Sequence, residues 1–157
     1  MLKRIIFIAV LLATFFIIFN FSAQDGNTSG SISEKVTKFV VNIISKISNI
    51  NEETQNNIIE KMHPIIRKLA HFSIYTVVGF SIMGVMCTFD VGNKLKIGTS
   101  LIVGVIYAIS DEIHQYYIPG RACRLFDVGI DSLGVIAGIC ILVGCICISN
   151  KAIRKKV

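Results

Sequence analysis

The chain has 157 residues, of which 53% are hydrophobic and 17% are charged, and its mean hydropathy is +0.68. This composition excludes an ordinary soluble domain and is typical of a small integral membrane protein that forms one domain over residues 1–157. The net charge of +6 does not indicate nucleic-acid binding, because the chain has no basic stripe interleaved with aromatic residues.

The first apolar segment covers about residues 4–21 and follows Lys3 and Arg4. It is long enough to cross a bilayer core of roughly 30 Å at about 1.5 Å per residue. The segment is either a transmembrane helix or a signal peptide. Cleavage after Ala23 would place the bulky Phe21 where a signal peptide needs a small residue, which favours a retained anchor.

The segment at about residues 31–63 is more polar, and we expect it to be helical and extracytoplasmic. Ser31 to Glu34 matches a capping box, which predicts a helix start there. Apolar residues then recur at helical spacing. This apolar stripe comprises Ile32, Val36, Phe39, Val40, Ile43, Ile44 and Ile47. The preferred interpretation is packing against the protein's own bundle, and the alternative is contact with lipid or a partner. His63, before Pro64, is expected to be solvated at a helix end.

Three further apolar spans are predicted at about residues 65–89, 95–117 and 125–149, which makes an all-α bundle of four transmembrane helices. Positive charge is retained on the cytoplasmic side of a membrane. The basic residues outside the spans are Lys3, Arg4, Lys94, Lys96, Lys151, Arg154, Lys155 and Lys156. They predict a topology with both termini on the cytoplasmic side, and with segment 22–64 and loop 118–124 on the extracytoplasmic side.

Small residues and cysteines complete the expected architecture. Two rows of small residues predict close helix packing, one formed by Ser100, Gly104 and Ala108 and the other by Gly134 and Gly138. Four of the five cysteines lie within apolar runs, so all five are expected to be free thiols.

Polar residues gather at the extracytoplasmic ends of the predicted spans. Arg67, His71 and Tyr75 are spaced i, i+4 and i+8, which places them on one face of a helix. Asp127 and Asp131 share a face with the glycines of their span, so this face is expected to point inward. Ionisable groups within membrane spans cost roughly 2.5–3.5 kcal/mol each, and their presence therefore needs an explanation.

Three interpretations of this cluster remain open. In the first, Arg67, Lys68, Arg121 and Arg124 form structural ion pairs with Asp111, Glu112, Asp127 and Asp131. In the second, the cluster is a pocket for a phosphate or carboxylate, with Arg67 and Arg121 as anion clamps and His71, Glu112 and His114 as acid–base groups. The third is a metal site built from His71, His114, Glu112, Asp127 and Asp131. It is the least favoured, because the arginines oppose a cation and the spacing fits no zinc motif. No metal and no cofactor are predicted.

Four motifs in order resemble the VanZ-like family over roughly residues 15–140. They are Arg67-Lys68-Leu69-Ala70-His71 with Tyr75, Ser110-Asp111-Glu112-Ile113-His114-Gln115, Pro119-Gly120-Arg121, and Asp127 and Asp131 followed by Gly134. The resemblance implies a bacterial cell-envelope membrane protein and an association with glycopeptide (teicoplanin) resistance. It implies further site residues at Lys68, Tyr75, Asp111, Gln115, Asp127 and Asp131. Ile74 departs from the glutamate that many relatives carry there, which argues against a carboxylate mechanism at that position.

The leading functional hypothesis is an outward-facing pocket that recognises a phosphate- or carboxylate-bearing envelope component, such as a lipid-linked cell-wall precursor, and so influences glycopeptide susceptibility. The expected partners are membrane lipids or such an anionic headgroup, not nucleic acid. The alternative is a non-catalytic membrane scaffold whose amphipathic helix binds a partner. Whether the chain is an enzyme, and its oligomeric state, stay open.

Overall fold

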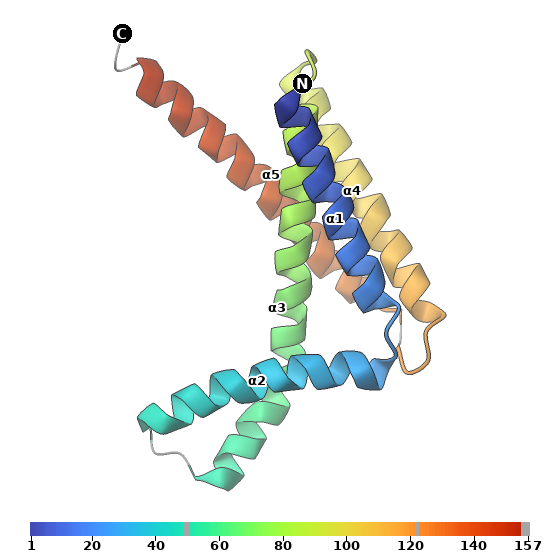
Figure 1. The fold of residues 1–157 in the computed structure, drawn as a ribbon, viewed down its shortest axis with the longest axis vertical. Coiled ribbons are helices and arrows are strands. Elements are labelled where there is room, and N and C mark those ends of the chain that lie inside the picture. Colours follow the sequence, from blue (N-terminus) through green and yellow to red (C-terminus); the bar gives the residue numbers. More distant parts are fainter. Residues whose placement is uncertain (49–50, 122, 155–157) are drawn as a thin grey trace.

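The computed structural model describes residues 1–48, 51–121 and 123–154, and within these ranges the chain forms five helices and no strand. Four of the helices are long and apolar enough to cross a membrane, which confirms the predicted all-α membrane fold. These four are α1 (Leu2–Ser22), α3 (Glu52–Met86), α4 (Asn93–Tyr116) and α5 (Leu125–Arg154). The remaining helix, α2 (Gly26–Ser48), lies across one end of the bundle (Figure 1).

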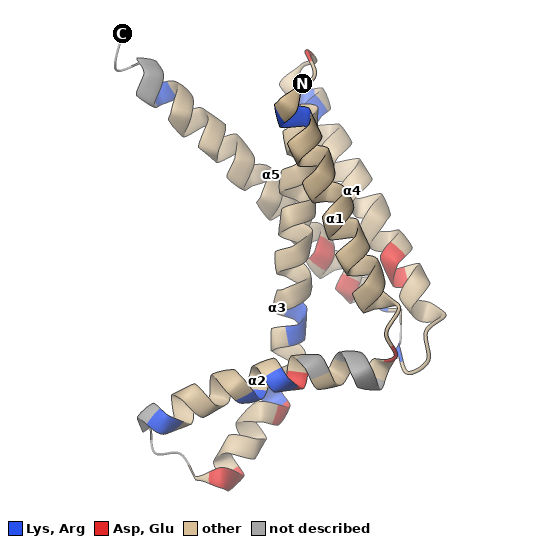
Figure 2. Ribbon diagram, viewed as in Figure 1, with Lys and Arg blue, Asp and Glu red and all other residues tan. Residues whose placement is uncertain are grey.

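The two chain termini lie at the end of the bundle opposite to α2 (Figure 1). The most extensive helix–helix contact is between α3 and α5, while α1 and α4 also pack on α3. Basic residues gather near the chain termini, where one acidic position also lies in the α3–α4 loop (Figure 2). Both acidic and basic residues lie toward the α2 end, and the acidic ones include positions near the end of α4 and the start of α5. The fold therefore separates a basic, terminal end from an end that carries the polar cluster.

The start of α2 differs from the sequence-based prediction. The helix begins at Gly26, five residues before Ser31, so the helix start predicted from the capping box is wrong. The Gly26 N–H donates a hydrogen bond to the Pro119 carbonyl at 3.1 Å, and a Cβ atom at Gly26 would approach the carbonyl oxygen of Gly120 to 2.2 Å. A contact with the α4–α5 loop thus fixes where α2 begins, and no local sequence pattern records that contact.

α3 is longer than predicted, because it runs without interruption from Glu52 through Pro64 into the membrane span. Its N-terminus is capped by Asn51, whose side chain accepts a hydrogen bond from the Thr54 N–H at 3.0 Å. The expected solvated helix end at His63 is therefore wrong. His63 Nε2 instead lies 2.8 Å from the Ser33 hydroxyl and 3.1 Å from the Gly30 carbonyl. α2 packs on α3, and α3 continues as a helix past Pro64.

The apolar stripe of α2 faces mostly away from the bundle. Phe39, Ile43 and Ile44 are exposed, so the preferred interpretation of packing against the bundle is wrong for these three residues. Val36 is half-exposed, and it lines a space between α1, α2 and α3. Thr37 and Val41 are the side chains that α2 buries fully, while the side chains of Ile32 and Ile47 lie outside the described residues. The orientation favours the alternative interpretation, in which this helix contacts lipid or a partner.

Close contact between helices depends on the two predicted rows of small residues. A Cβ atom at Gly138 would lie 2.0 Å from the Thr76 carbonyl oxygen, and one at Gly134 would lie 2.5 Å from the Phe72 carbonyl oxygen, so α5 packs directly on the α3 backbone. On α4, Ser100, Gly104 and Ala108 are all buried, and Gly104 faces Val135 of α5. Both rows are confirmed as helix-packing surfaces.

All five cysteines are free thiols, as expected. Cys123 is exposed in the α4–α5 loop, whereas Cys140, Cys145 and Cys147 lie within α5 and Cys87 directly follows α3. The loop therefore carries one accessible thiol at the end of the bundle that is remote from the termini.

Candidate functional site

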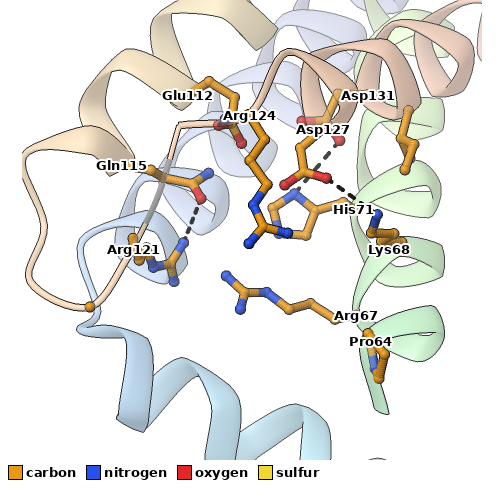
Figure 3. Close-up of a pocket in the computed structure, with 12 residues that line it drawn as sticks. Pro64, Arg67, Lys68, His71, Glu112, Gln115, Arg121, Arg124, Asp127 and Asp131 are labelled. Carbon is orange, nitrogen blue, oxygen red and sulfur yellow. Dashed lines mark hydrogen bonds and ion pairs between the residues drawn. The ribbon is translucent and has the colours of Figure 1, made fainter. Parts of the chain in front are cut away.

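A polar cavity of about 310 Å³ opens at the α2 end of the bundle, between α3, the end of α4, the α4–α5 loop and the first turns of α5 (Figure 3). Its volume is at the lower limit of the roughly 300–1,000 Å³ typical of small-molecule sites. Eight of the eleven predicted site residues line it, namely Arg67, Lys68, His71, Glu112, Gln115, Arg121, Asp127 and Asp131. The helices thus bring together residues that lie up to 64 positions apart in the sequence.

Three guanidinium groups point into this cavity from different elements (Figure 3). Arg67 comes from α3, while Arg121 and Arg124 come from the α4–α5 loop. The side chains of Arg67 and Arg124 make no hydrogen bond and no ion pair with any residue that the structure describes. These two cations therefore face the cavity with their donors unused.

Arg121 is held in a different way. Its guanidinium donates hydrogen bonds to the carbonyls of Phe21 (2.6 Å) and Gln24 (3.0 Å) and to the Gln115 side-chain oxygen (2.9 Å). Burial and the neighbouring positive charge of Arg67 lower the pKa of Arg121 from its ordinary value. An arginine remains cationic at neutral pH even so. Arg121 consequently ties the C-terminal end of α1 to α4 as well as lining the cavity.

Three acidic side chains also line the cavity, on the side from which Arg124 extends (Figure 3). Glu112 is buried and accepts a hydrogen bond from the Arg124 backbone N–H at 3.0 Å. Asp127 lies 3.7 Å from the Lys68 ammonium, and Asp131, which is fully buried, lies 3.6 Å from His71 Nδ1. Both carboxylate oxygens of Asp131 and one oxygen of Asp127 have no hydrogen-bond partner within the described chain.

The predicted network of structural ion pairs is therefore sparse. Of the four bases proposed for it, only Lys68 lies within ion-pair distance of a carboxylate among the described residues. Arg121 instead bonds neutral oxygens, and the other two arginines have no acidic partner there. Separated cations and carboxylates around an open space can bind a ligand that carries both an anionic group and hydrogen-bond donors.

Asp111 does not line the cavity but forms a buried hydrogen-bonding centre behind it. Its Oδ1 accepts a hydrogen bond from the Ser22 hydroxyl at 2.5 Å. Its Oδ2 accepts from the Tyr75 hydroxyl at 3.1 Å and from the Gln115 amide at 2.9 Å. Asp111 thereby links α1, α3 and α4, and through Gln115 it supports Arg121.

His114 is the predicted acid–base residue that lies farthest from this arrangement. Its ring stacks on Phe19 of α1 with 5.0 Å between the ring centroids, and it does not line the cavity. Of the three predicted acid–base groups, only His71 and Glu112 therefore face the space that a ligand could occupy.

Among the residues that the structure describes, one group of side chains is compact enough to hold a metal ion. His71, Asp111 and Asp131 each offer a ligand atom, and these atoms lie within 4.8 Å of one another. Both oxygens of Asp111 already accept hydrogen bonds, however, and guanidinium groups stand across the cavity. Most of the coordination capacity of Asp111 is thus in use within the protein.

Arg124 is the cavity-lining cation that the sequence analysis did not place among the ligand-binding residues. It was counted only as a partner for an ion pair. The sequence signal that indicates a cavity position for Arg124 is its place three residues after Arg121 in the same short loop. A loop of this length brings both residues to the same helix ends.

The sequence profile that describes the VanZ/LLP1 family matches residues 7–148. No curated protein and no solved structure matches the chain. The matched region contains all the residues that line the polar cavity and almost the whole of the four membrane-spanning helices. The chain therefore belongs to the VanZ/LLP1 family.

Proposed function

We propose that the polar cavity binds the phosphate or carboxylate group of a cell-envelope component. The observation that carries the proposal is the pair of guanidinium groups, Arg67 and Arg124, that face the cavity without an acidic partner among the described residues. A guanidinium presents a rigid fork of donors that matches two oxygens of one anion. Two such forks with Arg121 beside them form a strong anion site.

The acidic side chains of the cavity restrict the ligand further. Asp131 is buried, its oxygens accept no hydrogen bond from the described residues, and its ion-pair partner there is His71 at 3.6 Å. A buried carboxylate costs free energy when its oxygens lack hydrogen-bond donors. A ligand hydroxyl or amine would supply the missing donors. The site therefore favours an anion that carries neighbouring hydroxyl or amino groups over a bare inorganic ion.

Membership of the VanZ/LLP1 family supports a proposed role in the cell envelope and in glycopeptide susceptibility. We propose that the chain is a bacterial cytoplasmic-membrane protein, and that occupancy of the cavity by an envelope precursor alters teicoplanin susceptibility. Basic residues at the terminal end support a cytoplasmic location for both termini, and we propose on this ground that the cavity opens on the extracytoplasmic side (Figure 2).

The proposal is tested by Arg67→Gln. We expect the affinity of the purified protein for glycerol 3-phosphate to fall at least about tenfold, since a hydrogen bond to a charged group contributes roughly 1.5–3 kcal/mol. In a deletion strain, the variant should lose the effect of the wild type on teicoplanin susceptibility at equal membrane abundance. Isothermal titration, immunoblotting and susceptibility measurements report these three quantities.

Lys61→Gln is the matched control, because it removes the same charge from α3 at an exposed position that does not line the cavity. It should leave both binding and susceptibility unchanged. If Arg67→Gln also leaves both unchanged at equal abundance, the cavity does not bind the anion. The scaffold hypothesis would then be favoured.

The proposed orientation is tested with the thiol of Cys123. A membrane-impermeant maleimide added to intact cells should label the protein, and Cys123→Ser should abolish this labelling. The other four thiols lie within or next to the membrane-spanning helices and should not react from outside. Labelling of Cys123 only after the cells are permeabilised would place the cavity on the cytoplasmic side instead.

A further inference from the structure

A second cavity adjoins the polar one and has a different character. Its volume is about 260 Å³, and it lies between the end of α1, the first half of α2 and the middle of α3. Its walls are mostly apolar and include Ile18, Phe21, Val36, Ile66, Ala70 and Ile74. Water is a poor occupant of such a space, because few polar groups are available to bond it.

The two cavities meet at three polar side chains. Arg67, His71 and Arg121 line both of them, so a molecule whose charged group lies at these residues can extend into either space. One side of this junction offers hydrocarbon walls and the other offers guanidinium and carboxylate groups. An amphiphilic molecule has a charged end and an apolar end, and the two adjoining cavities offer a matching environment for each.

The position of the apolar cavity also indicates a membrane ligand. One of its walls is formed by Val36, which belongs to the exposed apolar stripe of α2. A helix with such a stripe lies at the surface of the bilayer with its apolar face in the acyl region. The cavity is therefore placed where a chain can enter from the lipid, while a headgroup reaches the polar cavity at the end of the bundle.

We infer that the ligand is a phosphate-headed membrane lipid, whose headgroup occupies the polar cavity while one hydrocarbon chain occupies the apolar cavity between α1, α2 and α3. The inference rests on the proposed function, which supplies the anion, and it adds the class of molecule that carries this anion. Arg67 and Arg124 are assigned to the phosphate, with Arg121 beside them, while Ala70 of α3 and Val36 of α2 are assigned to the walls around the chain.

The test compares three probes on the full-length protein in dodecyl maltoside micelles, whose detergent carries no phosphate. Phosphatidic acid carries both phosphate and chains, diacylglycerol carries only chains, and glycerol 3-phosphate carries only the headgroup. We expect phosphatidic acid to bind at least about tenfold more tightly than either partial probe, since only the complete molecule makes both sets of contacts. Native mass spectrometry of the intact complex measures the bound fraction of each probe.

Filling the apolar cavity should remove this preference. Ala70→Phe is expected to lower the affinity for phosphatidic acid to that for glycerol 3-phosphate, which should itself stay unchanged. Val36→Phe fills the same space from α2 and provides an independent variant if the first fails to fold. Leu69→Phe is the matched control, because Leu69 is an exposed neighbour that lines neither cavity.

The outcomes separate this inference from the proposed function. If both filling variants fold and bind phosphatidic acid as the wild type does, the chain is not in the apolar cavity and the inference is wrong, although the anion site stands. If the wild type binds diacylglycerol as tightly as phosphatidic acid, the chain is recognised and the anion is not, which overturns the inference and the proposed function together. If none of the three probes binds, the inference and the proposed function are both wrong.

Discussion

Replacing Arg121 with glutamine should remove most of the protein from the membrane. The guanidinium bonds two carbonyl oxygens at the end of α1 and the Gln115 side chain, and glutamine is too short to reach all three. The bonds to Gln24 and Gln115 are partly buried, and each acceptor left there without a donor costs about 1–3 kcal/mol, which is a large fraction of the stability of a small protein. The Phe21 carbonyl is exposed and also accepts from the Gln24 N–H, so its loss costs less. Membrane abundance by immunoblot and the melting temperature in detergent measure this loss.

Arg124→Gln is the matched control for this prediction, since it removes the same charge from the same loop and its side chain has no bonded partner in the described chain. It should keep normal abundance. Arg121→Lys should be almost as damaging as glutamine, because an ammonium keeps the charge but cannot reproduce the fork of donors. Normal abundance of Arg121→Gln would show that α1 is held by other contacts.

Replacing Asp111 with leucine should destabilise the bundle by a comparable amount. The substitution leaves Ser22, Tyr75 and Gln115 without their common acceptor in a buried region where three helices meet. We expect a loss on the order of 2 kcal/mol or more, since each unpaired buried group costs about 1–3 kcal/mol. Thermal unfolding in detergent, together with membrane abundance, checks this result.

Asp111→Asn distinguishes a hydrogen-bonding role from a role of the charge itself. The asparagine oxygen can accept hydrogen bonds from Tyr75 and Gln115. The asparagine amide can donate to the Ser22 hydroxyl, because a hydroxyl can accept a hydrogen bond as well as donate one. We therefore expect the asparagine variant to fold with only a small loss of stability. If asparagine is as damaging as leucine, the negative charge is required. A cation held by His71, Asp111 and Asp131 would require it in this way.

The polar residues of the family motifs fall into two groups according to what their side chains contact. Arg121 and Asp111 hold helices together, whereas the side chains of Arg67 and Arg124 face a cavity and have no bonded partner among the described residues. Loss of function after substitution at the first pair does not by itself identify a binding site, because the fold is lost too. Arg67 is therefore the more informative position at which to test anion binding.

The sequence by itself determined the membrane architecture and the location of the polar cluster. Four runs of apolar residues are sufficient to identify four membrane-spanning helices, because the cost of placing polar groups in a bilayer depends on local composition. Helical spacing also placed Arg67 and His71 on one face, and short loops brought the ends of neighbouring spans together. Eight of the predicted site residues consequently line one cavity.

Only the tertiary structure decided which partner each polar group has. α2 begins at Gly26, which contacts Pro119, and α3 includes His63, which contacts Ser33. The extents of both helices therefore depend on residues distant in the sequence. The structural role of Arg121 depends in the same way on carbonyl groups almost 100 residues away. The apolar cavity between α1, α2 and α3 arises only from the packing of three helices. Hydropathy and spacing are local properties, whereas bonded partners and cavities depend on how the whole chain is arranged.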